Sequence, residues 1–520
     1  MMRQQSPFGT HSMATTEIVS DPLSTEHLYA DLKGRSVRGG FWTLGSQGTQ
    51  FLIQSISTVV LARLLAPVDF GIVAMVTAVT GLGQAFADFG LSEATIQRKE
   101  ITHKQVSTLF WINVAIGLGL TIITLALAPV LSWFYKEPRL KDITFLFSLT
   151  FLICGLRVQH DALLKRQMRF RSLAMRDVAS YAVAVPVGIA MAYHGAGYWA
   201  LVALPLTLNG TQLALSWLMV RWIPGLPQRD AEVGSMIAFG GNVAASYLIA
   251  NVTYSADNVL VGWYWGAGPL GLYSRAYNLL MLPVRQLNGP ASSVAIPALS
   301  RVQGEPERLA RYYLRTVNLI MWVGAPTFGF LFVAANPVIL VVLGRQWLEA
   351  APIFQILAIS SLAQMLINST NWLFIGRGQS RRLLRFLIIT SPIIVGSYAL
   401  GLPFGVKGVA LSGSLTLVGI APWVLRFAFR GTDLTLRRLG QSIFWPALLC
   451  LASVFVAEFA LLMITPRRAV WQLLVVALGF AGVYSVSALI PPIRKEIISF
   501  QGLFGELWSR RSGVVSTVVE

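Results

Sequence analysis

Long apolar segments recur from one end of the chain to the other. A helix needs about 20 mostly apolar residues to cross the roughly 30 Å hydrocarbon core of a bilayer. The sequence offers fourteen such windows, with charged or Gly/Pro-rich breaks between them, at approximately 39–62, 70–92, 105–135, 143–164, 174–193, 196–220, 234–261, 272–298, 316–341, 350–375, 386–404, 408–428, 440–464 and 469–492. Because backbone groups in lipid must be satisfied within a helix or a closed barrel, these windows predict an all-α polytopic membrane protein.

Charged residues are scarce and lie mostly between these windows. Asp, Glu, Lys and Arg make up 12% of the chain, whereas about a quarter of the residues of a soluble protein carry charge. The formal net charge is +18, but 30 of the 41 Lys and Arg residues fall on one side of the predicted topology and eight on the other. Because basic loops tend to stay in the cytoplasm, we expect both termini to be cytoplasmic. The positive charge thus indicates topology, and we expect no nucleic acid partner.

The two halves of the chain share a weak internal repeat. When residues 40–71 are aligned with residues 240–271, five of 32 positions are identical, against about two or three expected from average composition. The identical pairs are Gly40/Gly240, Ser46/Ser246, Ser55/Ser255, Val59/Val259 and Gly71/Gly271. Six predicted spans lie on either side of a polar linker, and both halves run in the same direction through the membrane, as in transporters built from parallel repeats.

This layout predicts two six-helix lobes in a parallel pseudo-twofold repeat, with an extra helix pair appended. We divide the uncharged run 178–220 into two spans at residues 194–197, where two glycines favour a turn. The predicted units are a disordered cytoplasmic tail (1–35), an N-terminal lobe (36–222), a linker (223–233), a C-terminal lobe (234–430), the appended pair (431–492) and a second cytoplasmic tail (493–520).

Four of the predicted spans carry stripes of polar side chains. Residues spaced three or four apart share one face of a helix, so such a stripe points at one neighbouring helix or one cavity. The residues concerned are Gln47, Gln50, Gln54, Tyr247, Asn251, Tyr254, Asn278, Gln364, Asn368 and Asn371. Hydrogen bonds between helices explain a single stripe, but four stripes, two of them at equivalent positions of the repeat, favour a shared water-filled cavity.

Ionisable residues inside the spans are stronger indicators of function, because a charge at the bilayer centre costs about 2.5–3.5 kcal/mol and persists when it is paired or faces water. Asp257 suits proton or cation coupling, or a structural pair with an arginine. Arg275 and Arg285 suit a cavity role, although Arg275 could instead extend to the membrane surface. Arg157 and Asp161 share a helix face and either serve the cavity or neutralise each other. Arginine suits phosphate, so these residues weakly favour an amphiphile with an anionic headgroup.

Motifs of catalysis and cofactor binding are lacking in the sequence. It has no P-loop, no H-E-x-x-H and no G-x-G-x-x-G after a strand, and its five histidines lack the spacing of metal ligands. We therefore expect no enzyme activity, no cofactor and no metal site.

Six short motifs, in order along roughly residues 36–430, resemble those of a known family. They are LLAPVDFG at 64–71, DFGLSEATIQR at 88–98, ALLKRQMRF at 162–170, DNVLVG at 257–262, GPLGLYSRAY at 268–277 and IPALSR at 296–301. The chain thereby resembles the bacterial polysaccharide transporters of the multidrug/oligosaccharidyl-lipid/polysaccharide superfamily, especially the colanic-acid-type exporters. Asp257 and Arg275 fall on positions that match the family pattern.

The resemblance implies a flippase in the bacterial inner membrane that moves a polyprenyl-pyrophosphate-linked oligosaccharide to the periplasmic leaflet by alternating access. Its expected partners are this substrate, membrane lipids, a glycan polymerase with export machinery, and a coupling cation, H⁺ or Na⁺. Two alternatives remain open from the sequence. One is a cation-coupled multidrug exporter of the same superfamily, and the other is a membrane glycan polymerase or ligase, which the short outward loops disfavour.

Overall fold

The computed structural model describes residues 32–228 and 253–494, apart from residues 88, 89, 99, 254 and 492. This part of the chain is helical and contains no strand. Residues 253 and 255–265 are helical. The other elements are α1 (Leu32–Leu64), α2 (Pro67–Ala87), α3 (Leu91–Gln97), α4 (His103–Tyr135), α5 (Leu140–Arg166), α6 (Phe170–Tyr193), α7 (Trp199–Val220), α9 (Ala267–Arg301), α10 (Pro306–Val333), α11 (Ala335–Val342), η2 (Arg345–Trp347), α12 (Ala350–Gly376), α13 (Ser380–Gly401), η3 (Leu402–Phe404), α14 (Gly405–Phe429), α15 (Leu436–Ile464) and α16 (Ala469–Ser487).

The helices confirm the predicted all-α membrane protein. Within the described ranges, nine helical segments are long and apolar enough to cross a membrane. One of them, residues 381–429, contains two predicted spans, so the count of fourteen stays a prediction. Most of the predicted span 234–261 lies outside the described residues, as do Tyr247, Asn251 and Tyr254.

Several helix ends follow from local sequence. The predicted division of the run 178–220 is confirmed, because α6 ends at Tyr193 and α7 begins at Trp199. Gly195 and Gly197 lie between them with φ of 78° and 57°, a left-handed conformation that glycine adopts without steric cost.

Other boundaries differ from the prediction. The expected single span 316–341 is broken between α10 and α11. Pro337 lies in the first turn of α11, where its missing N–H is tolerated but where it would disrupt a continuous helix. α1 begins at Leu32, within the range expected for the tail, because polar residues can extend a helix beyond the bilayer. α16 ends at Ser487, shortly before two prolines.

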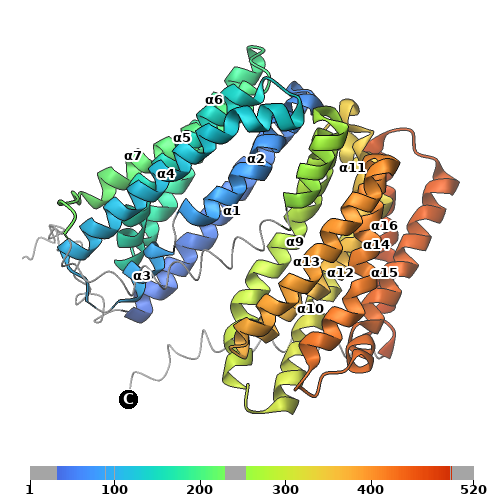
Figure 1. The fold of residues 1–520 in the computed structure, drawn as a ribbon. Coiled ribbons are helices and arrows are strands. Elements are labelled where there is room, and N and C mark those ends of the chain that lie inside the picture. The colour runs from blue at the N-terminus through green and yellow to red at the C-terminus, as the bar shows by residue number, and fades with distance from the viewer. Residues whose placement is uncertain are drawn as a thin grey trace, which may run out of the picture.

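The helices form two groups, which we call the N-lobe (α1–α7) and the C-lobe (residues 255–265 with α9–α14). Figure 1 shows the lobes lying together at one end, near the starts of α2 and α9, and diverging toward the other end, where α3 lies. We call these the meeting end and the diverging end. α9 begins at the meeting end and runs for 35 residues, so the arginine-containing loop after it lies at the diverging end.

The starts of α2 and α9 cross at very close range. A β-carbon placed on Gly71 would lie 1.7 Å from the carbonyl oxygen of Ala267, and one placed on Gly271 would lie 1.9 Å from the carbonyl oxygen of Pro67. Both pairs reproduce the 200-residue offset of the sequence repeat, since Pro67 corresponds to Ala267 and Gly71 to Gly271. This reciprocal contact supports the parallel repeat and requires glycine at both positions.

A hydrophobic cluster seals the meeting end around this crossing. The rings of Phe134 and Trp263 stack across the lobes with centroids 6.0 Å apart. The buried members of the cluster are Ile72, Met75, Val76, Leu131, Tyr135, Leu140, Ile143, Phe147 and Val202 of the N-lobe and Val261, Leu270, Leu402 and Val409 of the C-lobe. The lobes are therefore packed together at this end.

Hydrogen bonds from the C-lobe segment around η2 add a second link, which we call the latch. Trp347 Nε1 donates to the carbonyl of Ala62 at 2.7 Å, and Gln346 Nε2 donates to the same carbonyl and to that of Leu65 at 3.1 Å. The Ala62 carbonyl belongs to the last turn of α1, whose oxygens have no partner within the helix, and Leu65 directly follows that helix. Arg63 donates in return to the carbonyl of Val341.

The appended pair α15–α16 packs on the outer side of α10. Cys450 Sγ lies 3.1 Å from the carbonyl oxygen of Ala325, and the rings of Trp322 and Tyr484 meet edge to face. The pair thus extends the C-lobe and takes no part in the cluster at the meeting end.

Candidate functional site

Exposed polar side chains lie on α1 of the N-lobe and on α9 of the C-lobe. Figure 1 shows both helices, together with α2, on the sides where the lobes adjoin. Gln47 and Gln54 of α1 are exposed and Gln50 is half-buried, while Asn278 and Arg285 of α9 are exposed. Exposure of an arginine in the middle of a membrane helix is favourable where water reaches it. The facing sides of the two lobes therefore suit the polar cavity that the sequence predicts.

One residue of the α1 stripe contacts a neighbouring helix. Gln54 Nε2 donates to the hydroxyl of Tyr181 on α6 at 2.8 Å. The stripe on α12 has a contact of its own, in which Gln364 Nε2 donates to Asn368 Oδ1 at 2.9 Å, one turn away. Asn371 is half-buried on the same helix. Some of the predicted cavity residues thus have hydrogen bonds within the protein.

Arg275 reaches from α9 to the N-lobe. Its Cζ lies 3.9 Å from the ring centroid of Phe70 on α2, a distance that gives a cation–π attraction. Phe70 in turn meets Trp347 of the latch edge to face, with centroids 5.2 Å apart. Within the described part of the chain, neither Arg275 nor Arg285 has an ion pair with a carboxylate. Arg275 is therefore held by a ring and keeps its charge available for an anion.

Asp257 is buried and hydrogen-bonded within the C-lobe. Its Oδ2 accepts a bond from the Tyr273 hydroxyl at 2.9 Å, and its Oδ1 accepts bonds from the backbone N–H and the side chain of Asn258 at 2.7 and 3.2 Å. Among the ion pairs found in the described ranges, none involves Asp257. The predicted pairing with an arginine is therefore not what the described residues show.

A small cavity adjoins this carboxylate in the C-lobe. It encloses about 90 Å³ between residues 253–265 and helices α9, α12, α13 and α14. Most of its lining surface is apolar, and the residues that bring hydroxyl or amide groups to it are Thr253, Tyr273, Tyr277, Ser360, Ser361, Gln364, Thr390, Ser391, Tyr398 and Ser414. Tyr273 both lines the cavity and donates to Asp257. The Asp257 carboxylate is therefore linked to this cavity through one hydroxyl group.

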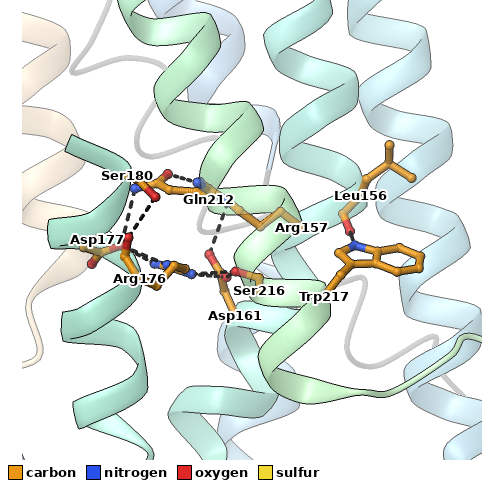
Figure 2. A network of polar contacts seen from close by, with 9 residues as sticks. All are labelled: Leu156, Arg157, Asp161, Arg176, Asp177, Ser180, Gln212, Ser216 and Trp217. Atoms are coloured by element: carbon orange, nitrogen blue, oxygen red, sulfur yellow. Dashed lines mark hydrogen bonds and ion pairs between the residues drawn. The ribbon is translucent and has the colours of Figure 1, made fainter. Parts of the chain in front are cut away.

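Arg157 and Asp161 belong to a network of charges inside the N-lobe (Figure 2). Arg157 Nε lies 3.3 Å from Asp161 Oδ2, one turn along α5, and Arg157 also donates to Gln212 of α7. Arg176 of α6 forms ion pairs with Asp161 and with Asp177, the latter at 2.6 Å. Two arginines and two aspartates thus balance each other.

The remaining contacts tie the network to α7. Ser216 Oγ donates to Asp161 Oδ1 at 2.8 Å and accepts from Arg176 at 3.0 Å, while Gln212 Nε2 donates to Asp177 at 3.3 Å. Since Arg157 lies within ion-pair distance of Asp161 and donates to Gln212, the geometry favours mutual neutralisation over the predicted cavity role. The sequence analysis did not single out Arg176. It is the third residue of the predicted span 174–193, so we counted it with the basic loop before that span and not among the charges inside the membrane.

The first residues of the linker are fastened to the N-lobe. The indole of Trp222 donates to His103 Nδ1 at 3.1 Å, and His160 Nε2 lies 3.2 Å from the Trp222 carbonyl oxygen. The backbone N–H of Gly225 donates to Ser107 Oγ at 2.9 Å. Residues 221–228 therefore belong structurally to the N-lobe, although the sequence predicts that the lobe ends at residue 222.

Comparisons with known proteins agree with this architecture. The chain matches the family described as polysaccharide biosynthesis protein over residues 60–352, more than half its length. It is 23% identical over 376 residues to the lipopolysaccharide biosynthesis protein WzxC of Escherichia coli (strain K12), covering 71% of this chain and 76% of that protein. It is 24% identical over 392 residues to the succinoglycan biosynthesis transport protein ExoT of Rhizobium meliloti (strain 1021), covering 74% and 78%.

The fold is similar to that of the lipid II flippase MurJ in an inward closed conformation. The TM-score is 0.66 at 14% sequence identity, and the similarity covers 87% of this chain and 99% of that one. At this level of identity the likeness concerns the fold.

Proposed function

The chain belongs to the polysaccharide biosynthesis protein family, and from this premise we propose that it flips a polyprenyl-pyrophosphate-linked oligosaccharide across the membrane. The observation that carries the proposal is a pair of lobes that pack together at one end and diverge toward the other (Figure 1). Arg275 of α9 contacts Phe70 of the N-lobe, and within the described residues neither Arg275 nor Arg285 has an ion pair with a carboxylate. Such a shape supports alternating access around a polar site.

The direction follows from the predicted topology. The sealed meeting end lies opposite the loop after α9, which belongs to the basic side of the chain. If the basic side is cytoplasmic, as the positive-inside rule predicts, the structure is closed toward the periplasm and loads substrate from the cytoplasmic leaflet. We accordingly place both termini in the cytoplasm and the protein in the bacterial inner membrane.

Arg275 and Arg285 are the proposed ligands of the pyrophosphate, because a guanidinium donates two parallel hydrogen bonds to phosphate oxygens. The amide groups of the facing helices are the proposed partners of the sugar hydroxyls: Gln47, Gln50, Gln54, Asn278, Gln364, Asn368 and Asn371. Tyr247, Asn251 and Tyr254, which lie outside the described residues, stay predicted partners of the glycan. We leave Arg157 out of this site because its donors serve the N-lobe network.

The alternatives are less supported. A drug exporter for organic cations needs a carboxylate in the central space, whereas Asp257 is buried against Tyr273. A glycan polymerase is disfavoured because the fold is similar to that of the lipid II flippase MurJ and a relative, ExoT, is described as a transport protein.

Transport by the purified protein tests the proposal. In liposomes that contain the cognate labelled lipid-linked oligosaccharide, we expect the wild type to move the glycan to the side where an added lectin binds it. Arg275→Ala and Arg285→Ala should each slow this movement by roughly tenfold or more, because a hydrogen bond to a charged group contributes about 1.5–3 kcal/mol. Arg308→Ala removes an exposed arginine that is paired with Glu305, and it should transport normally.

Two results would count against this site and this function. Wild-type rates in both α9 variants would show that the two arginines are peripheral. A wild-type protein that is folded in the liposomes and leaves the cognate glycan in place would refute the flippase.

We further propose that transport is coupled to H⁺ or Na⁺ at Asp257, on the basis of its burial and of its hydroxyl donor Tyr273, which also lines the small cavity of the C-lobe. An inward gradient of the coupling cation should then accelerate glycan movement by the wild type. In Asp257→Asn the acceleration should vanish, because a neutral amide neither binds a proton nor attracts a cation. Asp142→Asn, at an exposed position in the first turn of α5, serves as the matched control. A wild type that responds to neither gradient would exclude coupling.

A further inference from the structure

Eight arginines gather at one end of the C-lobe. They are Arg377, Arg381, Arg382, Arg385, Arg426, Arg430, Arg437 and Arg438, and we call them the arginine cluster. One acidic residue, Asp433, occurs in the stretches 377–385 and 426–438. The end of α12 lies beside the end of α9, because Gly376 packs against Leu299. The cluster therefore lies at the diverging end, on the side that the topology predicts to be cytoplasmic.

Three members of the cluster converge at the end of α14. Arg377 and Arg382 donate to the same oxygen, the carbonyl of Arg430, at 3.4 and 3.2 Å. Arg377 also donates to the carbonyl of Gly431 at 2.8 Å, and Arg382 to that of Phe427 at 2.9 Å. The Cζ atoms of Arg382 and Arg430 lie 5.4 and 5.8 Å from the ring centroid of Phe427. Carbonyl oxygens and one ring therefore hold several cations close together.

Within the described part of the chain, none of the ion pairs found involves an arginine of the cluster, and Asp433 is the one carboxylate in its two stretches. The ion pairs found there involve other arginines, such as Arg308 with Glu305 and Arg176 with Asp161. Partial burial, and then the positive charge of Arg382, lower the pKa of Arg377. The negative end of the α14 dipole explains why two arginines bind its last carbonyls. The dipole offsets only part of the positive charge of the eight arginines.

The eight basic residues of the cluster are all arginine, which bears on the kind of anion that they suit. The positive-inside rule is satisfied by either residue, and the chain has lysines elsewhere, including Lys104 and Lys165 on the same side of the predicted topology. The cluster contains arginine alone. Arginine presents a planar fork of donors that matches two oxygens of a phosphate, whereas lysine acts as a point charge.

The depth of the cluster is that of lipid headgroups. The apolar segment of α12 ends at Gly376 and the next apolar segment begins at residue 381, so the cluster lies at the boundary of the hydrocarbon. We propose that the arginine cluster binds the phosphate or pyrophosphate headgroup of a lipid in the adjoining leaflet. Two lipids have this chemistry, an anionic phospholipid and a polyprenyl pyrophosphate. The site is separate from α9 and does not depend on the proposed transport.

Lipid binding to the purified full-length protein tests the proposal. Native mass spectrometry would measure the affinity for polyprenyl pyrophosphate, for phosphatidylglycerol and for zwitterionic phosphatidylcholine. Arg382→Gln with Arg430→Gln should weaken binding of a phosphate-bearing lipid by roughly 30-fold, given the usual contribution of a basic residue near an anionic headgroup. The matched control, Arg308→Gln with Arg311→Gln, removes two exposed arginines at the same end of the lobe that are paired with glutamates. It should change the affinity less than twofold.

A second variant covers the event that the glutamine pair does not fold. Arg382→Lys with Arg430→Lys keeps both charges and should still weaken pyrophosphate binding, because the paired donors are lost. Selective loss of polyprenyl pyrophosphate binding would identify a docking site for the lipid carrier, and selective loss of phosphatidylglycerol binding would identify a phospholipid site. Equal affinities of the wild type and both folded cluster variants for all lipids would overturn the proposal.

Discussion

Replacing Gly71 with alanine is expected to force the lobes apart at the meeting end. The new methyl group would lie 1.7 Å from the Ala267 carbonyl oxygen, and a backbone atom cannot move away as a flexible side chain would. Overpacking of this kind costs about 1–3 kcal/mol, so the population of the closed arrangement should fall by a factor of roughly 5 to 150. Because alternating access requires both states, glycan transport should fall by a similar factor.

Disulfide cross-linking across the meeting end measures this shift directly. Cysteines introduced as Phe134→Cys and Trp263→Cys, in a background without Cys154 and Cys450, replace two rings that stack across the lobes. Gly71→Ala should reduce the cross-linked fraction, and Gly271→Ala should do the same through Pro67. Gly81→Ala is the control on the same helix, since open space surrounds its α-carbon. Undiminished cross-linking in both crossing variants would show that the contact relaxes.

Replacing Asp161 with alanine is expected to destabilise the N-lobe severely. Asp161 is shared by Arg157 and Arg176, and the side chains of Asp161 and Arg176 are only 16% and 8% exposed. Removing one partner from a buried network leaves an uncompensated charge and costs about 3–5 kcal/mol. Thermal unfolding in detergent should therefore show a large drop in midpoint, or a loss of folded protein.

Two comparisons separate this charge effect from a general loss of contacts. Glu305→Ala disrupts an ion pair with side chains 51% and 55% exposed, and it should leave the unfolding midpoint nearly unchanged, because exposed ion pairs contribute little to stability. Asp161→Asn with Arg157→Gln removes one charge of each sign and should be more stable than Asp161→Ala. If the double variant unfolds as readily as Asp161→Ala, the network is not held by charge balance.

Much of the fold was predictable because its determinants are local. Apolar windows locate the helices, and the glycines at 195 and 197 locate the turn between α6 and α7. The break between α10 and α11 was missed, because a window average does not register Pro337 in a first helical turn. The start of α1 was missed for a related reason, since hydropathy marks where the bilayer ends and not where the helix ends.

The candidate site was less predictable because its contacts join distant segments. Stripe periodicity placed Arg275 on α9, but nothing in the spacing indicates that Phe70, about 200 residues earlier, lies 3.9 Å from its guanidinium. Asp257 was recognised as a buried charge, yet its hydroxyl donor Tyr273 lies on another helix. The N-lobe network was unpredictable for the same reason. Arg176 and Asp161 lie on different helices, α6 and α5, and the sequence spacing does not show that these helices bring them together.

The crossing of α2 and α9 also bears on how such a chain could have originated. Residue 71 contacts residue 267 while residue 271 contacts residue 67, and this exchange of roles defines an isologous interface, as in a twofold symmetric homodimer. Each half carries both the glycine and the backbone surface that receives it. A half-length ancestor would therefore already have been complementary to a copy of itself at this point, before duplication and fusion joined the two copies in one polypeptide.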